Sequence, residues 1–234
     1  MIKTDVLVIG AGPGGYPAAF LAADLGMQVT LIDEEPRPGG VCLHHGCIPS
    51  KALLHVAALV EEAKQAADWG VTFAAPQIDL GKLRDWKQGV VDRLTAGLGH
   101  LAAQHKVDYV QGRATIVDAH SLSVTSVEGE IRVLPFDYAI VATGSVPAKV
   151  PDLDLDSPRV MDSNAALELE RVPETLLVVG GGYIGLEAAA DGVLVLCPIL
   201  VDVAVEGGPD VARVVARRTV DQGRAERDPR SRLV

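Results

Sequence analysis

Two cysteines lie close together in the sequence and are the side chains best suited to redox chemistry. Cys42 and Cys47 are separated by Leu-His-His-Gly, and Pro49 follows at a position that favours the first turn of a helix. Cys47 is therefore expected at the amino end of a helix, where the helix dipole stabilises a thiolate. Such a pair is suited to a reactive disulfide rather than a merely structural one.

Two other interpretations of this segment stay open. One is a zinc site, since four potential ligands fall within six residues: Cys42, His44, His45 and Cys47. So short a span leaves little freedom for tetrahedral closure, and we predict no metal. The other is a pair of inert, buried cysteines. The nearby glycines disfavour it, because they indicate close approach of the backbone to a bound group.

A glycine-rich turn precedes the cysteines and predicts a dinucleotide site. Gly10, Gly12 and Gly15 fit the pattern GxGxxG between an apolar run and an alanine-rich segment. The first glycine permits the tight turn, the second lets the backbone approach a pyrophosphate, and the third lets the helix pack on the strand. Asp33 ends the next apolar run and is expected to accept hydrogen bonds from an adenosine ribose.

A second fingerprint of the same kind lies late in the chain. Gly180, Gly182 and Gly185 follow the apolar run 176–179. Two fingerprints imply two dinucleotides. The second unit is poorer, because a glycine interrupts its helix after about two turns and a proline interrupts the apolar run expected to be its next strand.

The elements that must position these motifs indicate an α/β fold of Rossmann-like units. Apolar runs at 5–9 and 28–32 flank the first turn, as in a buried parallel sheet. Short runs between 109 and 135 predict a small antiparallel meander, and residues 138–142 return to a buried strand. One helix is expected at 49–67, and another carries an apolar face made by Val90, Leu94, Leu98 and Leu101.

Composition narrows the class of partner. The chain has 234 residues, 48% of them hydrophobic, and a formal net charge of −10, which disfavours nucleic acid and anionic membrane surfaces. Charged residues and glycines interrupt the long apolar stretch near the second fingerprint, so no membrane span is expected. With only three cysteines, the chain is not a disulfide-stapled secreted scaffold, and we expect a soluble, cytoplasmic protein.

The motifs together resemble one family. GAGPGGY, GGVCLHHGCIPSK, VATGS and VPETLLVVGGGYIGLE occur in the order and at the spacings of the pyridine nucleotide-disulfide oxidoreductases, and the resemblance runs from residue 1 to about 190. Within that family, GCIPSK is similar to the motif of the dihydrolipoyl dehydrogenases. Glutathione reductases more often carry lysine in place of Ser50. Mercuric reductases use a similar motif with a further cysteine pair near their carboxy-terminus.

The resemblance implies an electron relay in which dihydrolipoamide reduces a Cys42–Cys47 disulfide and the electrons pass through FAD to NAD⁺. Cys42 would exchange with lipoyl sulfur, and Cys47 would be the charge-transfer thiol against the flavin. The implied partners are a lipoyl domain of a 2-oxo acid dehydrogenase or related complex and a second copy in a homodimer. The implied cofactor-binding residues are Gly10, Gly12, Gly14, Gly15, Asp33, Glu34, Gly40, Val41, Lys51, Gly112, Ala114, Thr143 and Gly144 for FAD, and Gly180, Gly182 and Gly185 for NAD.

The carboxy-terminal part departs from the family pattern. The family's acid-base histidine comes from a late interface domain, but no histidine follows His120 here. We therefore expect a chain truncated or frame-shifted after about residue 190. The alternative functions are a non-catalytic or partner-dependent flavin-binding fragment, or another member of the family such as a mercuric or glutathione reductase. The expected organisation is an FAD-binding domain with its redox disulfide at 1–145, a linker at 146–175, an incomplete NAD-binding domain at 176–205, and a disordered tail at 206–234.

Overall fold

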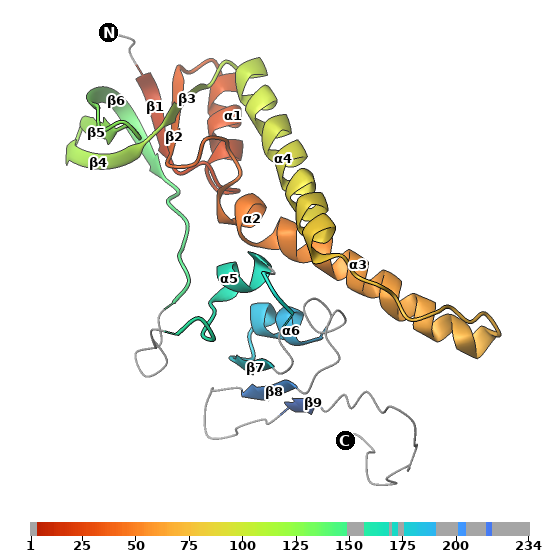
Figure 1. Ribbon diagram of the computed structural model, residues 1–234. Helices are drawn as coiled ribbons and strands as arrows, with labels where there is room; N and C mark the ends of the chain where they lie inside the picture. The colour runs from red at the N-terminus through yellow and green to blue at the C-terminus, as the bar shows by residue number, and fades with distance from the viewer. Residues whose placement is uncertain are drawn as a thin grey trace. The chain divides into compact units, whose positions relative to one another are not determined.

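The computed structural model describes residues 4–148, 157–168, 170–172, 176–190, 201–204 and 214–216 (Figure 1). The chain divides into two compact units, one made of Met1–Leu53 and Asp79–Leu169, the other of Leu54–Ile78 and Glu170–Val234. The domain limits expected from the sequence stay predictions, and residues 149–156, 169 and 173–175 of the expected linker 146–175 lie outside this description.

The first unit is built on a six-stranded mixed sheet with the strand order β3-β2-β1-β6-β5-β4. The first four strands in this order pair in parallel, and β6, β5 and β4 pair antiparallel as a meander. The predicted α/β class with a parallel sheet and an antiparallel meander is confirmed. The strands are β1 (Thr4–Ile9), β2 (Val29–Asp33), β3 (Asp108–Gln111), β4 (Arg113–Asp118), β5 (Ser121–Thr125) and β6 (Ile131–Val141).

One strand joins the two parts of the sheet. Residues 131–135 of β6 pair with β5, and the register with β1 then runs from Phe136 to Val141. The sequence predicted a buried strand at 138–142. Residues 138–141 do form a strand, as the end of β6, but Tyr138 and Val141 are exposed, so the predicted burial is wrong. Pro135 lies at the point where β6 passes from one partner to the other and does not end the strand.

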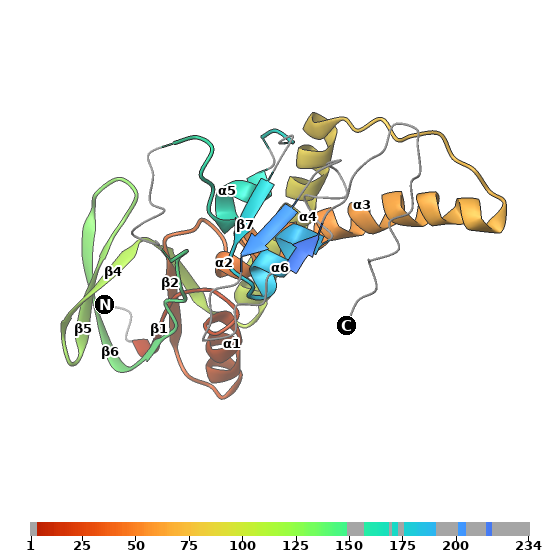
Figure 2. The same cartoon turned by 90° about the horizontal axis from the view of Figure 1, so that it is seen from below.

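Alternate side chains of the central strands face two apolar layers. Val6 and Val8 of β1 pack with helix α1 (Tyr16–Asp24) and the end of α4 (Leu80–Gln104), whereas Leu7 packs with the meander residues Leu122 and Val124. Figure 1 and Figure 2 show α1 and the meander on opposite sides of β1 and β2. β1 and β2 are thus buried on both faces, as their continuous apolar runs predicted.

The helices around the cysteines differ from the prediction in two ways. A one-turn helix, α2 (Gly40–His44), precedes them, and α3 (Cys47–Gln65) begins two residues before Pro49. A single turn that starts on glycine carries no helical periodicity, so the sequence could not reveal α2. Both cysteines consequently lie in helices, and a proline in the first turn of α3 is still tolerated.

The buried face of α4 is also displaced from the predicted one. Its buried residues include Val91 and Thr95, while Leu94 and Leu101 are exposed. Thr95 tolerates burial because its hydroxyl donates to the carbonyl oxygen of Val91 at 3.0 Å. The apolar periodicity therefore identified the helix but misplaced its face by one position.

The remaining elements are a 3₁₀ turn (Ala66–Trp69), α5 (Ser163–Glu168), β7 (Leu176–Val179), α6 (Tyr183–Ala190), β8 (Val201–Ala204) and β9 (Val214–Ala216). In the second unit β8 pairs in parallel with β7 and antiparallel with β9. A strand therefore follows the second fingerprint although Pro198 disfavoured one. Three residues of the predicted disordered tail also form a strand, and the rest of that tail lies outside the described residues.

Among the residues that the structure describes, no helix combines the length and the hydrophobicity needed to cross a membrane.

Candidate flavin and dithiol site

The first glycine turn is held closed by contacts that only glycine allows. Gly10 follows β1 with a φ of +97°, and a Cβ there would lie 2.2 Å from the carbonyl oxygen of Ala142 beyond β6. A Cβ on Gly15 would lie 1.7 Å from the carbonyl oxygen of Gly10. The first and third glycines are thus required by backbone packing at the carboxyl ends of β1 and β6.

The two middle glycines have room for a side chain. A Cβ on Gly12 would meet only the Cα of Gly40, at 3.7 Å, and one on Gly14 would meet only the Cβ of Ala142, at 3.8 Å. Both are ordinary van der Waals distances. Packing within the chain therefore does not explain these two glycines, whereas a group bound close to the backbone at the start of α1 does.

Asp33 fixes the turn from the end of β2. Its carboxylate accepts a hydrogen bond from the backbone N–H of Ala11 at 2.5 Å and one from that of Glu35 at 2.9 Å. Its carbonyl oxygen accepts from the N–H of Gly112 at 2.8 Å. The carboxylate thus lies beside the glycine turn, where a ribose hydroxyl would have to compete with or join these donors. Glu34, the next residue, turns outward to an exposed ion pair with Arg113 at 3.6 Å.

The cysteine segment begins directly on the glycine turn. The N–H of Gly39 donates to the carbonyl oxygen of Ala11 at 2.8 Å. Gly40 has a φ of +55°, and a Cβ there would lie 2.5 Å from the Cα of Gly12. A side chain at position 40 would therefore clash with the glycine turn. The predicted phosphate-binding turn and the start of α2 therefore form one interlocked structure.

The structure brings the two thiols together. Cys42 is half-buried and Cys47 is exposed, and the Cys42 thiol is hydrogen-bonded with Cys47. Burial raises the pKa of the Cys42 thiol, and the hydrogen bond and negative charge of Cys47 add to the rise, while the positive charge of Lys51 opposes it. Lys51, in the first turns of α3, thus acts electrostatically on Cys42.

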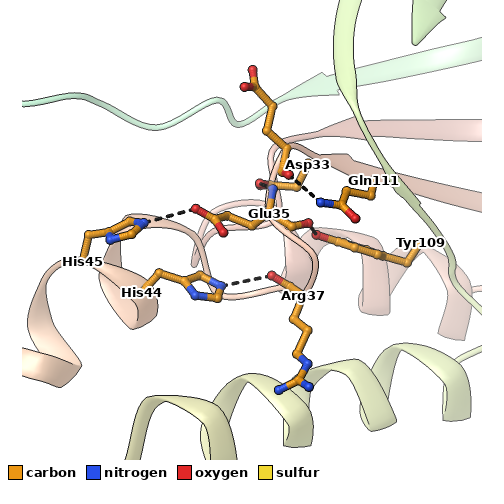
Figure 3. A network of polar contacts seen from close by, with 8 residues as sticks. Asp33, Glu35, Arg37, His44, His45, Tyr109 and Gln111 are labelled. Carbon is orange, nitrogen blue, oxygen red and sulfur yellow. Dashed lines mark hydrogen bonds and ion pairs between the residues drawn. The ribbon is translucent and has the colours of Figure 1, made fainter. Parts of the chain in front are cut away.

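The two histidines between the cysteines are directed toward the loop after β2 (Figure 3). His44 Nε2 donates to the carbonyl oxygen of Arg37 and His45 Nε2 to the carboxylate of Glu35, both at 3.1 Å. Within the described part of the chain, no group of three or more His, Cys, Asp or Glu side chains is placed to hold a metal ion. The four potential zinc ligands therefore do not converge.

Three of the remaining predicted flavin contacts lie near the glycine turn or the cysteines, and a fourth lies in the meander. Thr143 and Gly144 follow β6 at the edge where Gly10 lies, and the Cα of Thr143 would be 3.1 Å from a Cβ on Gly10. Val41 is exposed beside the cysteines. Ala114 in β4 is partly buried and packs against the core cluster that contains Leu7 and Leu122.

The second glycine turn repeats the first in its local geometry. Gly180 has a φ of +113°, a Cβ on Gly185 would lie 2.1 Å from its carbonyl oxygen, and a Cβ on Gly182 would meet nothing within 4 Å. These three residues belong to the second unit.

Sequence patterns missed several residues that support the first site. Tyr109 donates its hydroxyl to the carbonyl oxygen of Glu35 at 2.7 Å, and Gln111 donates to that of Glu34 at 3.0 Å. Both side chains come from β3, about 75 residues downstream of the loop that they hold. No local signal identifies such contacts. The pair Gly39-Gly40, in contrast, was a visible sign of close backbone approach.

Comparison with known proteins agrees with this arrangement. The family model described as pyridine nucleotide-disulphide oxidoreductase matches residues 4–220. The chain belongs to this family. A dihydrolipoyl dehydrogenase of Vibrio parahaemolyticus is 52% identical over 186 residues, which cover 80% of this chain and 39% of that protein. A dihydrolipoyl dehydrogenase 2 of Haloarcula marismortui is 44% identical over 227 residues, which cover 94% of this chain and 48% of that protein.

Solved structures show the same fold. LpdA from Mycobacterium tuberculosis superposes with a TM-score of 0.74 at 26% identity, over 86% of this chain and 44% of that one. The Cu(II) complex of the flavoprotein disulfide reductase RclA from Escherichia coli gives a TM-score of 0.66 at 30% identity, over 81% of this chain and 40% of that one. The chain thus spans less than half the length of each of these four proteins.

Proposed function

We propose that this chain forms the flavin-binding and dithiol part of an oxidoreductase of the dihydrolipoyl dehydrogenase type. The observation that carries the proposal is the interlocked site: a glycine turn with two glycines that packing does not require, joined through Gly39 and Gly40 to a segment bearing two adjacent thiols. The relatives named dihydrolipoyl dehydrogenase support this substrate class over glutathione or mercuric ion.

The residues present fit FAD. The middle glycines leave space beside the amino end of α1 for a pyrophosphate, and Asp33 lies at the adjoining strand end for the adenosine ribose. Thr143 and Gly144 line the same edge. When bound, FAD would supply the acceptor for the electron pair of the dithiol and its onward transfer to NAD⁺.

The chain's own thiols perform the exchange with substrate. One sulfur of dihydrolipoamide attacks Cys42 of the disulfide, Cys47 leaves as a thiolate, and the second lipoyl sulfur then displaces Cys42. Lipoamide is released with its two sulfurs joined, and the chain holds two more electrons and two protons as a dithiol. Lys51 opposes the rise in the pKa of Cys42 and so favours the thiolate forms that exchange needs.

The second glycine turn would bind NAD, with the pyrophosphate at the amino end of α6 near Gly182. A lipoyl domain of a 2-oxo acid dehydrogenase or related complex is the proposed carrier of the dithiol substrate. A homodimer and a cytoplasmic location complete the proposal.

The first test is the visible absorption spectrum of the purified chain. We expect a bound flavin, and addition of dithiothreitol should produce a long-wavelength band from a thiolate next to the flavin. Cys47→Ser should abolish that band, and Cys42→Ser should retain it. A chain that stays colourless when FAD is added, or a flavin whose spectrum is the same in all three proteins, would overturn the assignment.

A further inference from the structure

The junction between α2 and α3 sets the geometry of the two thiols. Cys42 lies in α2 and Cys47 begins α3, so residues 44–46 determine how far apart the sulfurs are. The junction is tight, since the N–H of His45 donates to the carbonyl oxygen of Val41 at 2.9 Å. A Cβ on Gly46 would lie 3.0 Å from the same oxygen. Any change at this junction alters the separation of the thiols.

Two consecutive histidines anchor the junction on one loop. His44 Nε2 donates to the carbonyl oxygen of Arg37, and His45 Nε2 donates to the carboxylate of Glu35, each at 3.1 Å. Because a carboxylate and a carbonyl oxygen only accept, both ring nitrogens carry the hydrogen. Figure 3 shows the two rings directed side by side onto this loop. The junction is thus attached at two points outside its own helices.

The loop that receives the histidines is itself rigidly held. The N–H of Glu35 donates to Asp33, and the carbonyl oxygen of Glu35 accepts from the Tyr109 hydroxyl at 2.7 Å. The carbonyl oxygen of Glu34 accepts from Gln111 at 3.0 Å. Glu35 is therefore a fixed point tied to β2 and β3, and its side chain reaches from there to the junction.

We propose that Glu35 and His45 are a positioning pair that holds the Cys42–Cys47 segment in the geometry of its disulfide. This inference rests on the proposed function, and it adds to it a residue pair that sets the redox equilibrium of the thiols. The Glu35 and His45 side chains are 37% and 42% exposed, so the pair contributes little to global stability and its effect is local. Restricting the junction raises the effective concentration of one thiol at the other, which favours the disulfide.

The direction of the effect follows from this constraint. Without the anchor, residues 44–46 sample more conformations in the reduced state, and closing the disulfide costs more entropy. The equilibrium constant for disulfide formation should then fall. We expect a fall of about threefold to tenfold, which corresponds to at most about 30 mV for a two-electron couple.

The experiment measures that constant in the full chain without requiring flavin or turnover. The protein is equilibrated in mixtures of reduced and oxidised dithiothreitol, quenched with acid and alkylated, and the peptide carrying both cysteines is quantified by mass spectrometry. In the reaction oxidised dithiothreitol gains two electrons and two protons from the two thiols, the Cys42–Cys47 bond forms, and dithiothreitol is left as a dithiol.

Four variants distinguish positioning from charge. Glu35→Ala and His45→Ala remove the bond and should lower the constant equally, and the double variant should lower it no further than either. Glu35→Gln keeps an acceptor for His45 without the charge and should restore the constant nearly to that of the parent. Asp24→Ala is the matched control, since it removes a comparable bond between His105 Nδ1 and Asp24, 2.6 Å long, remote from the cysteines in the sequence.

Equal constants for Glu35→Ala and the parent would overturn the positioning pair while leaving the proposed function intact. A constant that falls as far in Glu35→Gln as in Glu35→Ala would overturn it too, because charge would then be the cause. A parent chain that forms no Cys42–Cys47 disulfide in any mixture would overturn the proposed function and this inference together.

Discussion

The two glycine turns have nearly the same local backbone and very different surroundings. In both turns the first glycine has a positive φ, and the third glycine lies against the carbonyl oxygen of the first. A Cβ added to Gly15 would lie 1.7 Å from that oxygen, and one added to Gly185 would lie 2.1 Å from it. In the first turn, however, Ala11 also bonds with Asp33 and Gly39, and Gly12 lies against Gly40. Within the described residues the second turn shows no such contact at Gly182.

The difference separates what a local motif determines from what the rest of the fold adds. Three glycines at this spacing suffice to close a strand-turn-helix corner in either unit. A site for redox chemistry needs more: a strand-end carboxylate to fix the turn, and a second segment packed on it that carries the reactive groups. Only the first turn has both among the residues described, and the predictions below test how much each one contributes.

The largest effect is expected from the third glycine. In Gly15→Ala the new methyl group would overlap the carbonyl oxygen of Gly10, so the corner must open, and we expect the free energy of unfolding of the first unit to fall by about 3 kcal/mol or more. Gly185→Ala should disrupt only its own corner and leave flavin affinity unchanged. Thermal unfolding and flavin titration of both variants provide the comparison.

The control for these glycine variants is Gly89→Ala in α4, where a Cβ would meet nothing within 4 Å. This substitution in a helix should stabilise the chain by about 0.5–1 kcal/mol. A stable, flavin-binding Gly15→Ala protein would contradict the close packing of the first corner.

The next largest effect is expected at Asp33. Its carboxylate accepts two backbone N–H groups, and an asparagine can accept only one of them while turning its own N–H₂ toward the other. Asp33→Asn should therefore cost about 1–3 kcal/mol of stability, measured by urea unfolding. It should also weaken flavin binding, since the turn loses its support.

Asp79→Asn is the matched control, because Asp79 accepts a single N–H, from Lys82 at 3.1 Å, as the cap of α4. Asparagine caps a helix about as well, so a change of only a few tenths of a kcal/mol is expected. If the free energy of unfolding falls equally in the two variants, the bonds of Asp33 to the turn stabilise the chain no more than an ordinary helix cap does.

Gly12→Ala separates ligand binding from folding. A methyl group there is at ordinary contact distance from Gly40, so the stability of the ligand-free chain should be nearly unchanged. The methyl group would nevertheless occupy space needed by a pyrophosphate, and flavin affinity should fall at least tenfold, or about 1.4 kcal/mol. Gly182→Ala should leave flavin affinity at the parental value. Unchanged affinity in Gly12→Ala would show that the flavin does not approach this turn.

The same contrast explains what the sequence could reveal. The glycine spacing and the apolar runs around it are local patterns, and they correctly predicted the corner, its strands and the parallel sheet. The short helix α2, the displaced face of α4 and the loop contacts of Tyr109 depend on packing between segments far apart in the chain. No pattern within a short window contains that information. The predicted roles of individual site residues likewise stay predictions until a ligand is tested.

The smallest effect concerns the group that the first turn has and the second lacks, the adjacent thiols. Because the pKa of Cys42 is raised, its thiolate forms at higher pH than the thiolate of an ordinary cysteine. The rate of its alkylation by iodoacetamide should therefore reach half its maximum at a correspondingly higher pH. Lys51→Gln removes a positive charge that lowers this pKa, so the rate at mildly alkaline pH should fall about twofold to threefold. Cys47→Ser removes a negative charge that raises this pKa, so the rate should increase instead. Lys82→Gln is the control, because Lys82 is an exposed lysine that pairs with Asp79, and it should leave the rate unchanged.

Rates that change in the same direction in Lys51→Gln and Cys47→Ser would show that the two residues do not act on Cys42 through opposite charges. The two thiols would then be neighbours in space without being electrostatically coupled.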